Sequence, residues 1–508
     1  MENLNFGGVS GIVILVGYAA MMLLIGYLAG RKQPAVGESM SSYFLAGKGL
    51  GFVALFFTLY ATQYSGNTVV GYAPAAYRLG FPWWQSVMFF TFIVAVYLLF
   101  APRLYAISKR EDFLTPVDFL RHRFRSTAVS VLALLLMLWG LGNYLVEQLV
   151  AMGQGIAGLT GGTIPYQVGV VGFVLVMLAY AWMGGMRAVA LTDVMQGIAL
   201  LIGIMVLLAG GLYLIGGDLG SSTQYLLENE PEKAAVPPLD VSVGWLSLVL
   251  VVGFGAAVYP HAIQRIYAAQ SERTLKRSLG FMALMPPLTA GVVFVVGIIG
   301  ISLFPNLSDT ESEQLVGMIA NEVAGINPFF FVAMILLFGG VIAAIVSTAD
   351  SALLSFSSMI SKDIYAQYVN PEASQRRQVR VGKVWEVIAI AVVLWIAWNP
   401  PGTLYAIFVL KFELIAQLAP AFILGLYWNR LSAIPVFVGM LAGALLAGAM
   451  VVFGPESVYG LSGGLLGLLL NVGICVAGSL LMPASQEEAA HAERATRLPV
   501  YSADRGTA

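Results

Sequence analysis

The polar residues between Ala343 and Ser358 are the part of this sequence best suited to chemistry, because they interrupt an otherwise apolar run. The segment AAIVSTADSALLSFSS carries six hydroxyl side chains and the carboxylate of Asp350. Such groups are costly in hydrocarbon without partners, so we expect them to face a polar cavity or an ion. Their spacing places the carbonyl of Ala344 and the hydroxyls of Ser347 and Thr348 on one helical face. Neutral oxygens of this kind suit a hard monovalent cation such as Na⁺.

A second apolar segment, from Leu59 to Gly71, is also crowded with polar side chains. A helix broken near residues 64–66 would free the carbonyls of Ala61 and Tyr64 for a cation. The side chains around that break would line a cavity, and the candidates are Gln63, Ser65 and Thr68. The alternative is a kinked helix in which small residues only mark a close helix crossing.

A third segment, Gly253 to His261, has the same character. Pro260 removes a backbone donor and two glycines loosen the helix before it, so a second break is expected here. Interrupted helices at matching positions in two halves of a chain indicate a binding site near the middle of a membrane.

Two charged residues stand inside apolar runs, Glu147 and Lys411. The cost of an unpaired charge in a membrane favours an ion pair between them, with a structural or gating role. The alternatives are that Glu147 binds the amine of a solute or that Lys411 binds a solute carboxylate.

The elements that must position these residues follow from composition. Hydrophobic residues make up 59% of the 508 residues and charged residues 10%, against roughly a quarter charged in soluble domains. Repeated apolar runs of about 20 residues indicate helical membrane spans. No phosphate-binding G-x-x-x-x-G-K-[ST] motif occurs, and the last 26 residues are too few for a nucleotide-binding or signalling domain. We therefore expect neither ATP-driven transport nor catalysis, and no nucleic acid or obligate protein partner.

We predict about thirteen spans, at roughly 8–30, 50–77, 82–104, 127–157, 164–183, 189–215, 241–268, 279–304, 327–360, 382–399, 402–427, 432–453 and 460–482. Basic residues gather in alternate connections, while the opposite connections carry a cluster of acids. The positive-inside rule then places the N-terminus outside and the C-terminus in the cytoplasm of a multi-pass protein of the plasma (inner) membrane.

Spans two to six and seven to eleven are each five in number, so they can form two inverted halves. The predicted division is 1–48 as an N-terminal span outside the core, 49–215 and 241–430 as the two repeats, 216–240 as an outer loop, 431–482 as two C-terminal spans and 483–508 as a disordered cytoplasmic tail. The segments 216–240 and 361–381 are each expected to hold a short helix.

Together these segments resemble the sodium/solute symporter family, which includes sodium/proline, pantothenate, galactose and sialic acid transporters. The resemblance covers about residues 8–482. It rests on the motifs Tyr43–Lys48, Ala61–Gly71, Trp182–Arg187, Thr192–Gly197, Tyr259–Arg265, Ala343–Ser351 and Gly425–Arg430. It implies an all-α membrane fold with a leucine-transporter-like 5+5 inverted repeat and Na⁺ as coupling ion. The implied sodium ligands are the carbonyls of Ala61, Tyr64 and Ala344 and the hydroxyls of Ser347 and Thr348.

The resemblance also implies a second cation site. A family member with two sodium sites has a carboxylate at the position of Asp193, and the partners here would be Ser347 and Ser351, with Asp350 beside them. Two neighbouring carboxylates leave a second Na⁺ and a coupled proton both open. The alternative is that Asp193 is solvated at the membrane surface or caps its helix.

The solute is less well defined than the ion. Tyr144 matches a substrate position of the proline transporter, and Glu147 follows one turn later. Gln63 stands where that transporter has an aspartate, and Val252 and Ala256 replace its aromatic residues. We therefore expect Na⁺-coupled uptake of a small polar organic solute, for example a monocarboxylate, an amino acid or pantothenate. A proton-coupled symporter of the same fold and a membrane solute sensor are the alternatives; a channel lacks support because no filter motif repeats.

Overall fold

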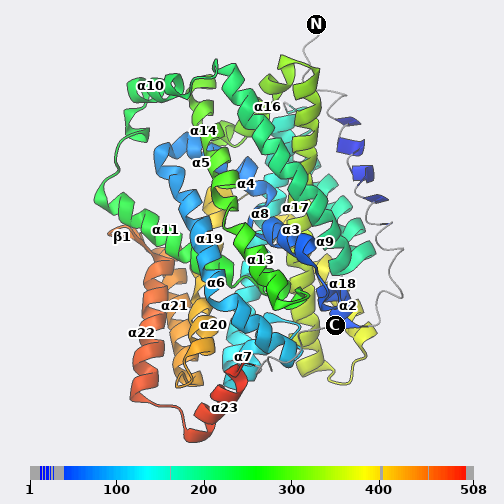
Figure 1. Ribbon diagram of the computed structural model, residues 1–508, viewed down its shortest axis with the longest axis vertical. Helices are drawn as coiled ribbons and strands as arrows, with labels where there is room; N and C mark the ends of the chain where they lie inside the picture. Colours follow the sequence, from blue (N-terminus) through cyan, green and yellow to red (C-terminus); the bar gives the residue numbers. More distant parts are fainter. Residues whose placement is uncertain are drawn as a thin grey trace, which may run out of the picture.

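The computed structural model describes residues 39–160, 162–400, 404–455 and 457–498, together with scattered positions between 12 and 27. Most of the predicted first span, 8–30, and the last ten residues of the tail lie outside the described residues. Within the described ranges, nine helices have the length and hydropathy needed to cross a membrane. Long helices run side by side along the molecule (Figure 1), so the prediction of an all-α membrane protein is confirmed.

The first half of the chain begins with short elements and continues in long helices. Its elements are α2 (Met40–Leu45), η1 (Ala46–Lys48), α3 (Phe52–Gln63), α4 (Gly66–Val70), α5 (Tyr72–Leu79), η2 (Phe81–Trp84), α6 (Gln85–Arg110), α7 (Pro116–Phe124), α8 (Thr127–Leu159), α9 (Tyr166–Leu214), α10 (Leu219–Asn229) and η3 (Pro231–Lys233). The continuous α9 contains two predicted spans, which meet at a bend where Gly185 has a φ of 58°. A side chain would be strained there, which is why glycine occupies the bend.

The second half repeats the alternation of broken and long helices. Its elements are α11 (Leu239–Ala257), α12 (Pro260–Ala268), α13 (Glu272–Met282), η4 (Pro287–Gly291), α14 (Val292–Leu303), α15 (Asp309–Ser312), α16 (Leu315–Ile326), α17 (Pro328–Met359), η5 (Ile360–Val369), α18 (Gln375–Ala397), α19 (Leu404–Ile415), η6 (Ala416–Leu418), α20 (Ala419–Tyr427), α21 (Ala433–Phe453), β1 (Ser457–Val458), β2 (Leu461–Ser462), α22 (Gly463–Leu481) and α23 (Gln486–Thr496). The two-residue strands form a small antiparallel hairpin between α21 and α22.

Both predicted helix breaks are present. The second predicted span divides at Tyr64, whose backbone leaves the helical region, and α4 begins after Ser65, whose hydroxyl accepts from the backbone N–H of Asn67 at 3.2 Å. The seventh predicted span divides at Val258 and Tyr259, directly before Pro260. At the first break the Ser65 side chain accepts one of the freed backbone N–H groups, and at the second Pro260 has no N–H that needs a partner.

Two of the connections differ from the prediction as follows. The apolar α16 lies between predicted spans eight and nine, where no helix was expected, and it packs on α8, α9 and α17. Its 12 residues are too few to cross a bilayer, so the pattern did not distinguish it from a loop. In the segment 361–381, α17 continues directly into the π-helix η5, and α18 begins seven residues before the predicted start of span ten. The segment 216–240 holds the predicted short helix, α10.

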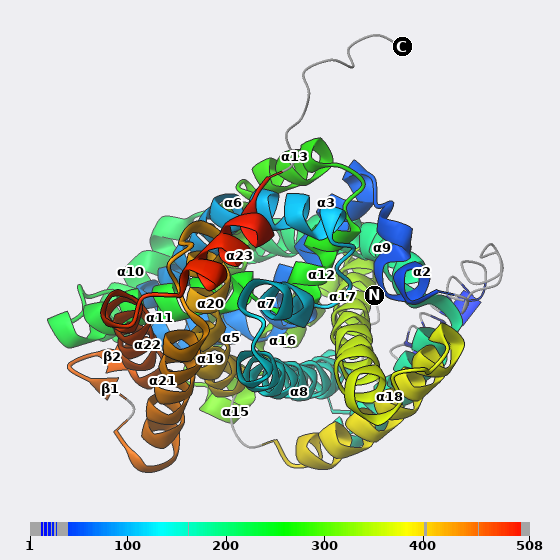
Figure 2. The same ribbon diagram turned by 90° about the horizontal axis from the view of Figure 1, so that it is seen from below.

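The tail prediction was wrong for residues 486–496, which form α23. Ser485 and Glu488 make a capping box at its start. At its end, Arg110 donates to the carbonyls of Arg494 (3.2 Å) and Ala495 (2.9 Å), so a cation on α6 supplies the donors that a helix C-terminus lacks. The Nε2 of His491 donates to the carbonyl of His122 at 2.7 Å, and burial lowers the pKa of that half-buried histidine on α7. Figure 2 shows α23 beside α7 at one end of the bundle.

Packing fixes which helices surround the centre. α17 contacts α8, α9, α3, α4 and α12, and α19 contacts α8 and α11. α21 and α22 pack on each other at one edge of the molecule, away from α9 and α18 (Figures 1 and 2). The two broken helices therefore lie among α8, α17 and α19, which supply the polar residues of the next section.

A prediction concerns the close approach of α4 to α17 at Gly66. A Cβ at this position would lie 2.0 Å from Cγ1 of Ile345 and 2.8 Å from the carbonyl oxygen of Val341. We expect Gly66→Ala to lower the free energy of unfolding by about 1–3 kcal/mol, because the clash includes backbone that cannot move away. Thermal unfolding in detergent measures the change.

The matched control for this prediction is Gly142→Ala in α8. No atom lies within 4 Å of the added Cβ there, so alanine should be neutral or stabilise the helix by up to about 1 kcal/mol. Equal stability of the two variants would contradict the close approach of α4 to α17.

Candidate functional site

The first part of the site is the contact between the break in α3–α4 and the polar face of α17. The hydroxyl of Thr348 donates to the carbonyl of Ala344 (2.7 Å) and to that of Ala61 (3.1 Å). Oxygens from two helices far apart in sequence therefore meet at one buried point. Tyr64 lies at the break itself, with its ring stacked between Tyr60 (4.8 Å) and Phe90 (4.4 Å).

The predicted second-cation residues lie on α17 and on the neighbouring helix α9. The hydroxyl of Ser347 donates to the carboxylate of Asp193 on α9, and the hydroxyl of Ser351 accepts from the guanidinium of Arg265 on α12. Asp193 is fully buried, which contradicts the alternative of a solvated surface residue. Asp350 is also fully buried, and neither of its carboxylate oxygens has a hydrogen-bond partner among the described residues.

The two intramembrane charges meet each other. Lys411 on α19 forms an ion pair with one carboxylate oxygen of Glu147 on α8, and the side-chain amide of Asn67 on α4 donates to the other oxygen. The charged side chains are each 2% exposed. The ammonium also lies over aromatic rings, 4.3 Å from the ring centre of Tyr144 and 4.8 Å from that of Phe408. The favoured prediction of an internal ion pair agrees with this geometry.

A cavity lies directly beside this ion pair. It contains about 20 Å³ of free volume, enough for roughly one water molecule. All six residues predicted to contact the solute line it: Gln63, Ser65, Thr68, Tyr144, Glu147 and Lys411. The Tyr144 hydroxyl donates to the carbonyl of Thr62 at 3.2 Å, and the Gln63 amide donates to the Tyr97 hydroxyl at 2.5 Å. Two of the residues that line the cavity, Gln63 and Tyr144, are therefore already engaged in hydrogen bonds within the protein.

Sequence reasoning missed part of this lining. Asn67 was given no role, and a set of aromatic residues was not predicted to line the cavity: Tyr72, Phe89, Phe90, Tyr259, Phe408 and Phe412. The signal for Asn67 was its place inside a membrane span, next to the break. The aromatic residues gave no signal, because aromatic side chains occur in helix-packing faces as well as in binding cavities. Val252 and Ala256, which replace aromatic residues of the proline transporter, do line the cavity.

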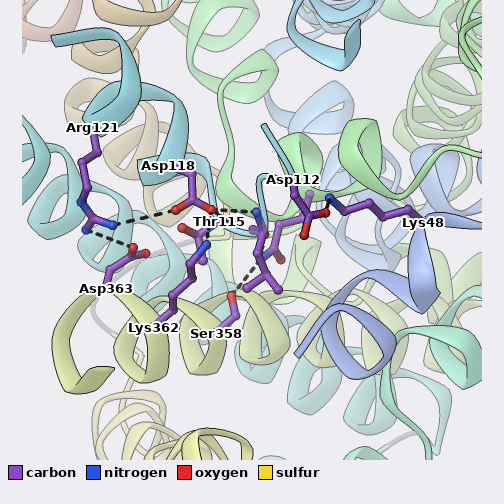
Figure 3. A network of polar contacts seen from close by, with 10 residues as sticks. Lys48, Asp112, Thr115, Asp118, Arg121, Ser358, Lys362 and Asp363 are labelled. Carbon is purple, nitrogen blue, oxygen red and sulfur yellow. Dashed lines mark hydrogen bonds and ion pairs between the residues drawn. The ribbon is translucent and has the colours of Figure 1, made fainter. Parts of the chain in front are cut away.

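A separate cluster of charges closes one end of the bundle, between α7 and η5. Asp118 pairs with Lys362 (2.5 Å) and Arg121 pairs with Asp363 (3.3 Å), while Lys48 pairs with Asp112 in front of α7. Asp118 also accepts from the backbone N–H groups of residues 114 and 115, as part of the cap of α7. Figure 3 shows these pairs near one another, and together we call them the α7 network.

Comparison with known proteins identifies the family. The model of the family described as "Sodium:solute symporter family" matches residues 43–443. The chain belongs to the sodium:solute symporter family. This symporter is 28% identical over 442 residues to the sodium/pantothenate symporter of Escherichia coli, covering 86% of this chain and 89% of the relative. It is 24% identical over 476 residues to the sodium/glucose cotransporter of Vibrio parahaemolyticus, covering 87% and 85%.

The fold has a solved counterpart. A Na⁺-coupled sialic acid symporter, in a substrate-bound outward-open state, matches with a TM-score of 0.76 and 21% identity, covering 95% of this chain and 99% of that one. The leucine-transporter-like fold class is thus confirmed, and the family match confirms that solute movement is coupled to Na⁺. The symporter is a multi-pass membrane protein and its solute is small.

A prediction concerns the stability contributed by the Glu147–Lys411 pair. Removing one partner leaves a buried, uncompensated charge, so we expect Lys411→Met to lower the free energy of unfolding by about 3–5 kcal/mol. The double variant Glu147→Gln, Lys411→Met should recover part of that loss, since it leaves no charge behind. Thermal unfolding in detergent measures both.

The control is the same lysine-to-methionine substitution in an ion pair at the surface. Lys276 pairs with Glu272 at 2.6 Å, but its side chain is 58% exposed. Lys276→Met should cost less than about 1 kcal/mol. Similar losses for the two single variants would show that burial of the Glu147–Lys411 pair does not govern stability.

Proposed function

We propose that Na⁺ binds between the broken helix α3–α4 and α17, on the carbonyls of Ala61, Tyr64 and Ala344 and the hydroxyls of Ser347 and Thr348. The observation that carries this proposal is the position of the Thr348 hydroxyl, within hydrogen-bond distance of the Ala61 and Ala344 carbonyls. Three of the five proposed oxygens are therefore already neighbours. A cation bound by these three oxygens, with the hydroxyl hydrogen turned away from it, would hold α3 to α17.

We propose further that the solute is a small organic monocarboxylate. Among the described residues that line the cavity, Glu147 and Lys411 are the charged ones, and they neutralise each other. A bound Na⁺ then leaves one positive charge in a buried site, which a solute carboxylate would balance. The Lys411 ammonium has three donors, and Glu147 uses one of them. The similarity to sodium/pantothenate symporters supports the same class, because pantothenate is a monocarboxylate.

The path of transport is proposed from the charge distribution. The end of the bundle that holds α7 and α23 is rich in arginine and lysine, and the positive-inside rule assigns it to the cytoplasm. The N-terminus would then lie outside. The Asp118–Lys362 and Arg121–Asp363 pairs join α7 to η5, so release of Na⁺ and solute to the cytoplasm would require these pairs to separate. Na⁺ and solute would each raise the affinity of the other, since binding is reciprocal.

The sodium proposal predicts a loss of Na⁺ affinity when the α17 hydroxyls are removed. Thr348→Val keeps the side-chain shape but removes a ligand, so the Na⁺ concentration for half-maximal uptake should rise about tenfold or more. Ser347→Ala should act in the same direction, and Thr348→Ser should stay near the wild type. Uptake into proteoliposomes at varied Na⁺ measures this.

The control for the sodium prediction is Thr91→Val in α6. Its hydroxyl also donates to the carbonyl four residues earlier, at 2.8 Å, but Thr91 is exposed on the outside of α6 and supplies none of the proposed ligands. Its half-maximal Na⁺ concentration should not change. A Thr348→Val variant with unchanged Na⁺ dependence would remove this site from consideration.

The solute proposal predicts selectivity for a carboxylate. We expect an inward Na⁺ gradient to drive uptake of pantothenate or lactate, and not of the corresponding amides, because only a solute with a net negative charge balances the site. Lys411→Gln should raise the KM for the transported acid much more than Glu147→Gln, since Glu147→Gln leaves the ammonium available. Preference for an amide or an uncharged sugar, or equal KM changes in the two variants, would contradict a direct contact with Lys411.

A further inference from the structure

The helix α23 forms a strap across the turn that joins α6 to α7. Two arginines of α6 hold its C-terminal end: Arg103 donates to the carbonyl of Thr496 at 3.3 Å, and Arg110 donates to three further carbonyls there. Nearer the start of α23, the Nε2 of His491 donates to the backbone carbonyl of His122 on α7 at 2.7 Å. A helix from the end of the chain thus ties together the two helices that flank this turn.

The strap is held mainly by polar contacts. Within α23 only three small side chains are buried, those of Ala492, Ala495 and Thr496. Small side chains bury little apolar surface, so hydrophobic burial contributes little to docking of α23. An element held in this way can detach without unfolding of the helices beneath it. Docking of α23 is therefore open to control by the charges at its contact surface.

The strap acts on α7, which supplies one side of the α7 network. Asp118 and Arg121 on α7 pair with Lys362 and Asp363 on η5, at the end of the bundle where α23 lies (Figures 2 and 3). When these pairs separate, α7 either changes its angle to α6 or carries α6 with it. A strap that spans the turn between α6 and α7 opposes the first of these movements.

The contact surface between α23 and α7 holds two histidines, His122 and His491, whose ring centres are 5.9 Å apart. Burial lowers the pKa of His122 from its ordinary value of 6.5, and its Nε2 has no hydrogen-bond partner among the described residues. The charged groups that act on His122 come from α6, the turn after it, α7 and α23: Arg110, Glu111, Arg125 and His491. Further charged residues line the cavity that the two histidines share: Asp112, Asp118, Arg121 and Lys362.

These surroundings disfavour a proton on His122 while α23 is docked. Glu111 is the acid that attracts such a proton, and its carboxylate is 3.8 Å from the Nδ1 of His122. However, Glu111 already pairs with Arg110 at 2.6 Å. Detachment of α23 would expose His122 to water and return its pKa towards 6.5. Docking is therefore strongest above about pH 6.5 and weakens as the pH falls through that value.

We propose that α23 is an autoinhibitory clamp, which slows separation of the α7 network while it is docked and is released when the solution at this end of the bundle becomes acidic. The inference rests on the proposed release of Na⁺ and solute through the α7 network and adds its regulation. His122 is a positioning residue, since it acts on transport through the docking of α23.

The first test measures docking without transport. Ala492 is fully buried, whereas Ala490 on the same helix is exposed. In detergent at about pH 7.5, a maleimide should modify the thiol of Ala492→Cys about tenfold or more slower than that of Ala490→Cys. The ratio of the two rates cancels the pH dependence of thiol reactivity, and it should approach one at about pH 6. The native Cys475 is buried and present in both variants.

Equal rates at about pH 7.5 overturn the clamp, because α23 would then not be docked. A slow reaction of Ala492→Cys that stays slow at about pH 6 overturns release by acid. Neither result depends on the identity of the solute or on Na⁺, so this test is independent of the proposed function.

The second test asks whether the clamp slows transport. Arg110→Gln removes the charge that holds the end of α23, and His491→Ala removes the contact with α7. Either change should raise the maximal rate of Na⁺-driven uptake into proteoliposomes about two- to tenfold, the range expected for loss of one hydrogen bond. The matched control is Arg273→Gln on α13, an exposed arginine with no contact to α23 among the described residues, and its rate should not change. Rates at or below the wild type in both clamp variants overturn the proposal.

The third test assigns the response to acid. His491 contacts the backbone carbonyl of residue 122, so His122→Gln should keep α23 docked but remove the titrating ring. Uptake by the wild type should rise when the pH on the α23 side is lowered from about 7.5 to about 6, and uptake by His122→Gln should stay constant. A full pH response in His122→Gln overturns the role of His122. Uptake that ignores Na⁺ overturns the proposed function instead, while thiol modification still reports whether α23 is docked.

Discussion

The organisation of this symporter depends on one constraint: the polar face of α17 lies in a membrane, so each of its groups needs a partner from another helix. Successive turns of that face meet different helices. The contacts are Thr348 with Ala61 on α3, Ser347 with Asp193 on α9, Ser351 with Arg265 on α12, and Ser355 with Gln264 on α12. These hydrogen bonds follow each other at helical spacing. A single face of α17 therefore contacts both broken helices.

Much of this arrangement could be predicted from the sequence, because the cost of polar groups in hydrocarbon is large and specific. Hydroxyls at helical spacing in an apolar run required partners, and the glycines and Pro260 marked where a helix would open. The same cost paired Glu147 with Lys411 although 264 residues separate them. In each case the residue types in a short segment predicted a contact or a helix break in the folded protein.

The rest depended on relations that a single sequence does not display. Arg265 stood within a recognised motif, yet only the packing of α12 against α3 and α17 reveals that it shares Ser351 with the expected cation set. The helix α16 was hidden by its length, and α23 was hidden because its last carbonyls are satisfied by Arg110, a residue almost 400 positions away. The composition of the tail predicted disorder, because the residue that stabilises α23 lies on α6 and is not part of the tail.

The small volume of the central cavity will affect the dissociation constants that are measured for its ligands. Pockets for organic ligands usually occupy some 300 Å³ or more, against about 20 Å³ here. Binding must therefore draw on a more open conformer, and the apparent dissociation constant equals the intrinsic one divided by the population of that conformer. Apparent affinity will thus vary with anything that shifts this population, including lipid composition, detergent and substitutions that never touch the ligand. Dissociation constants for this protein are best compared within one membrane environment.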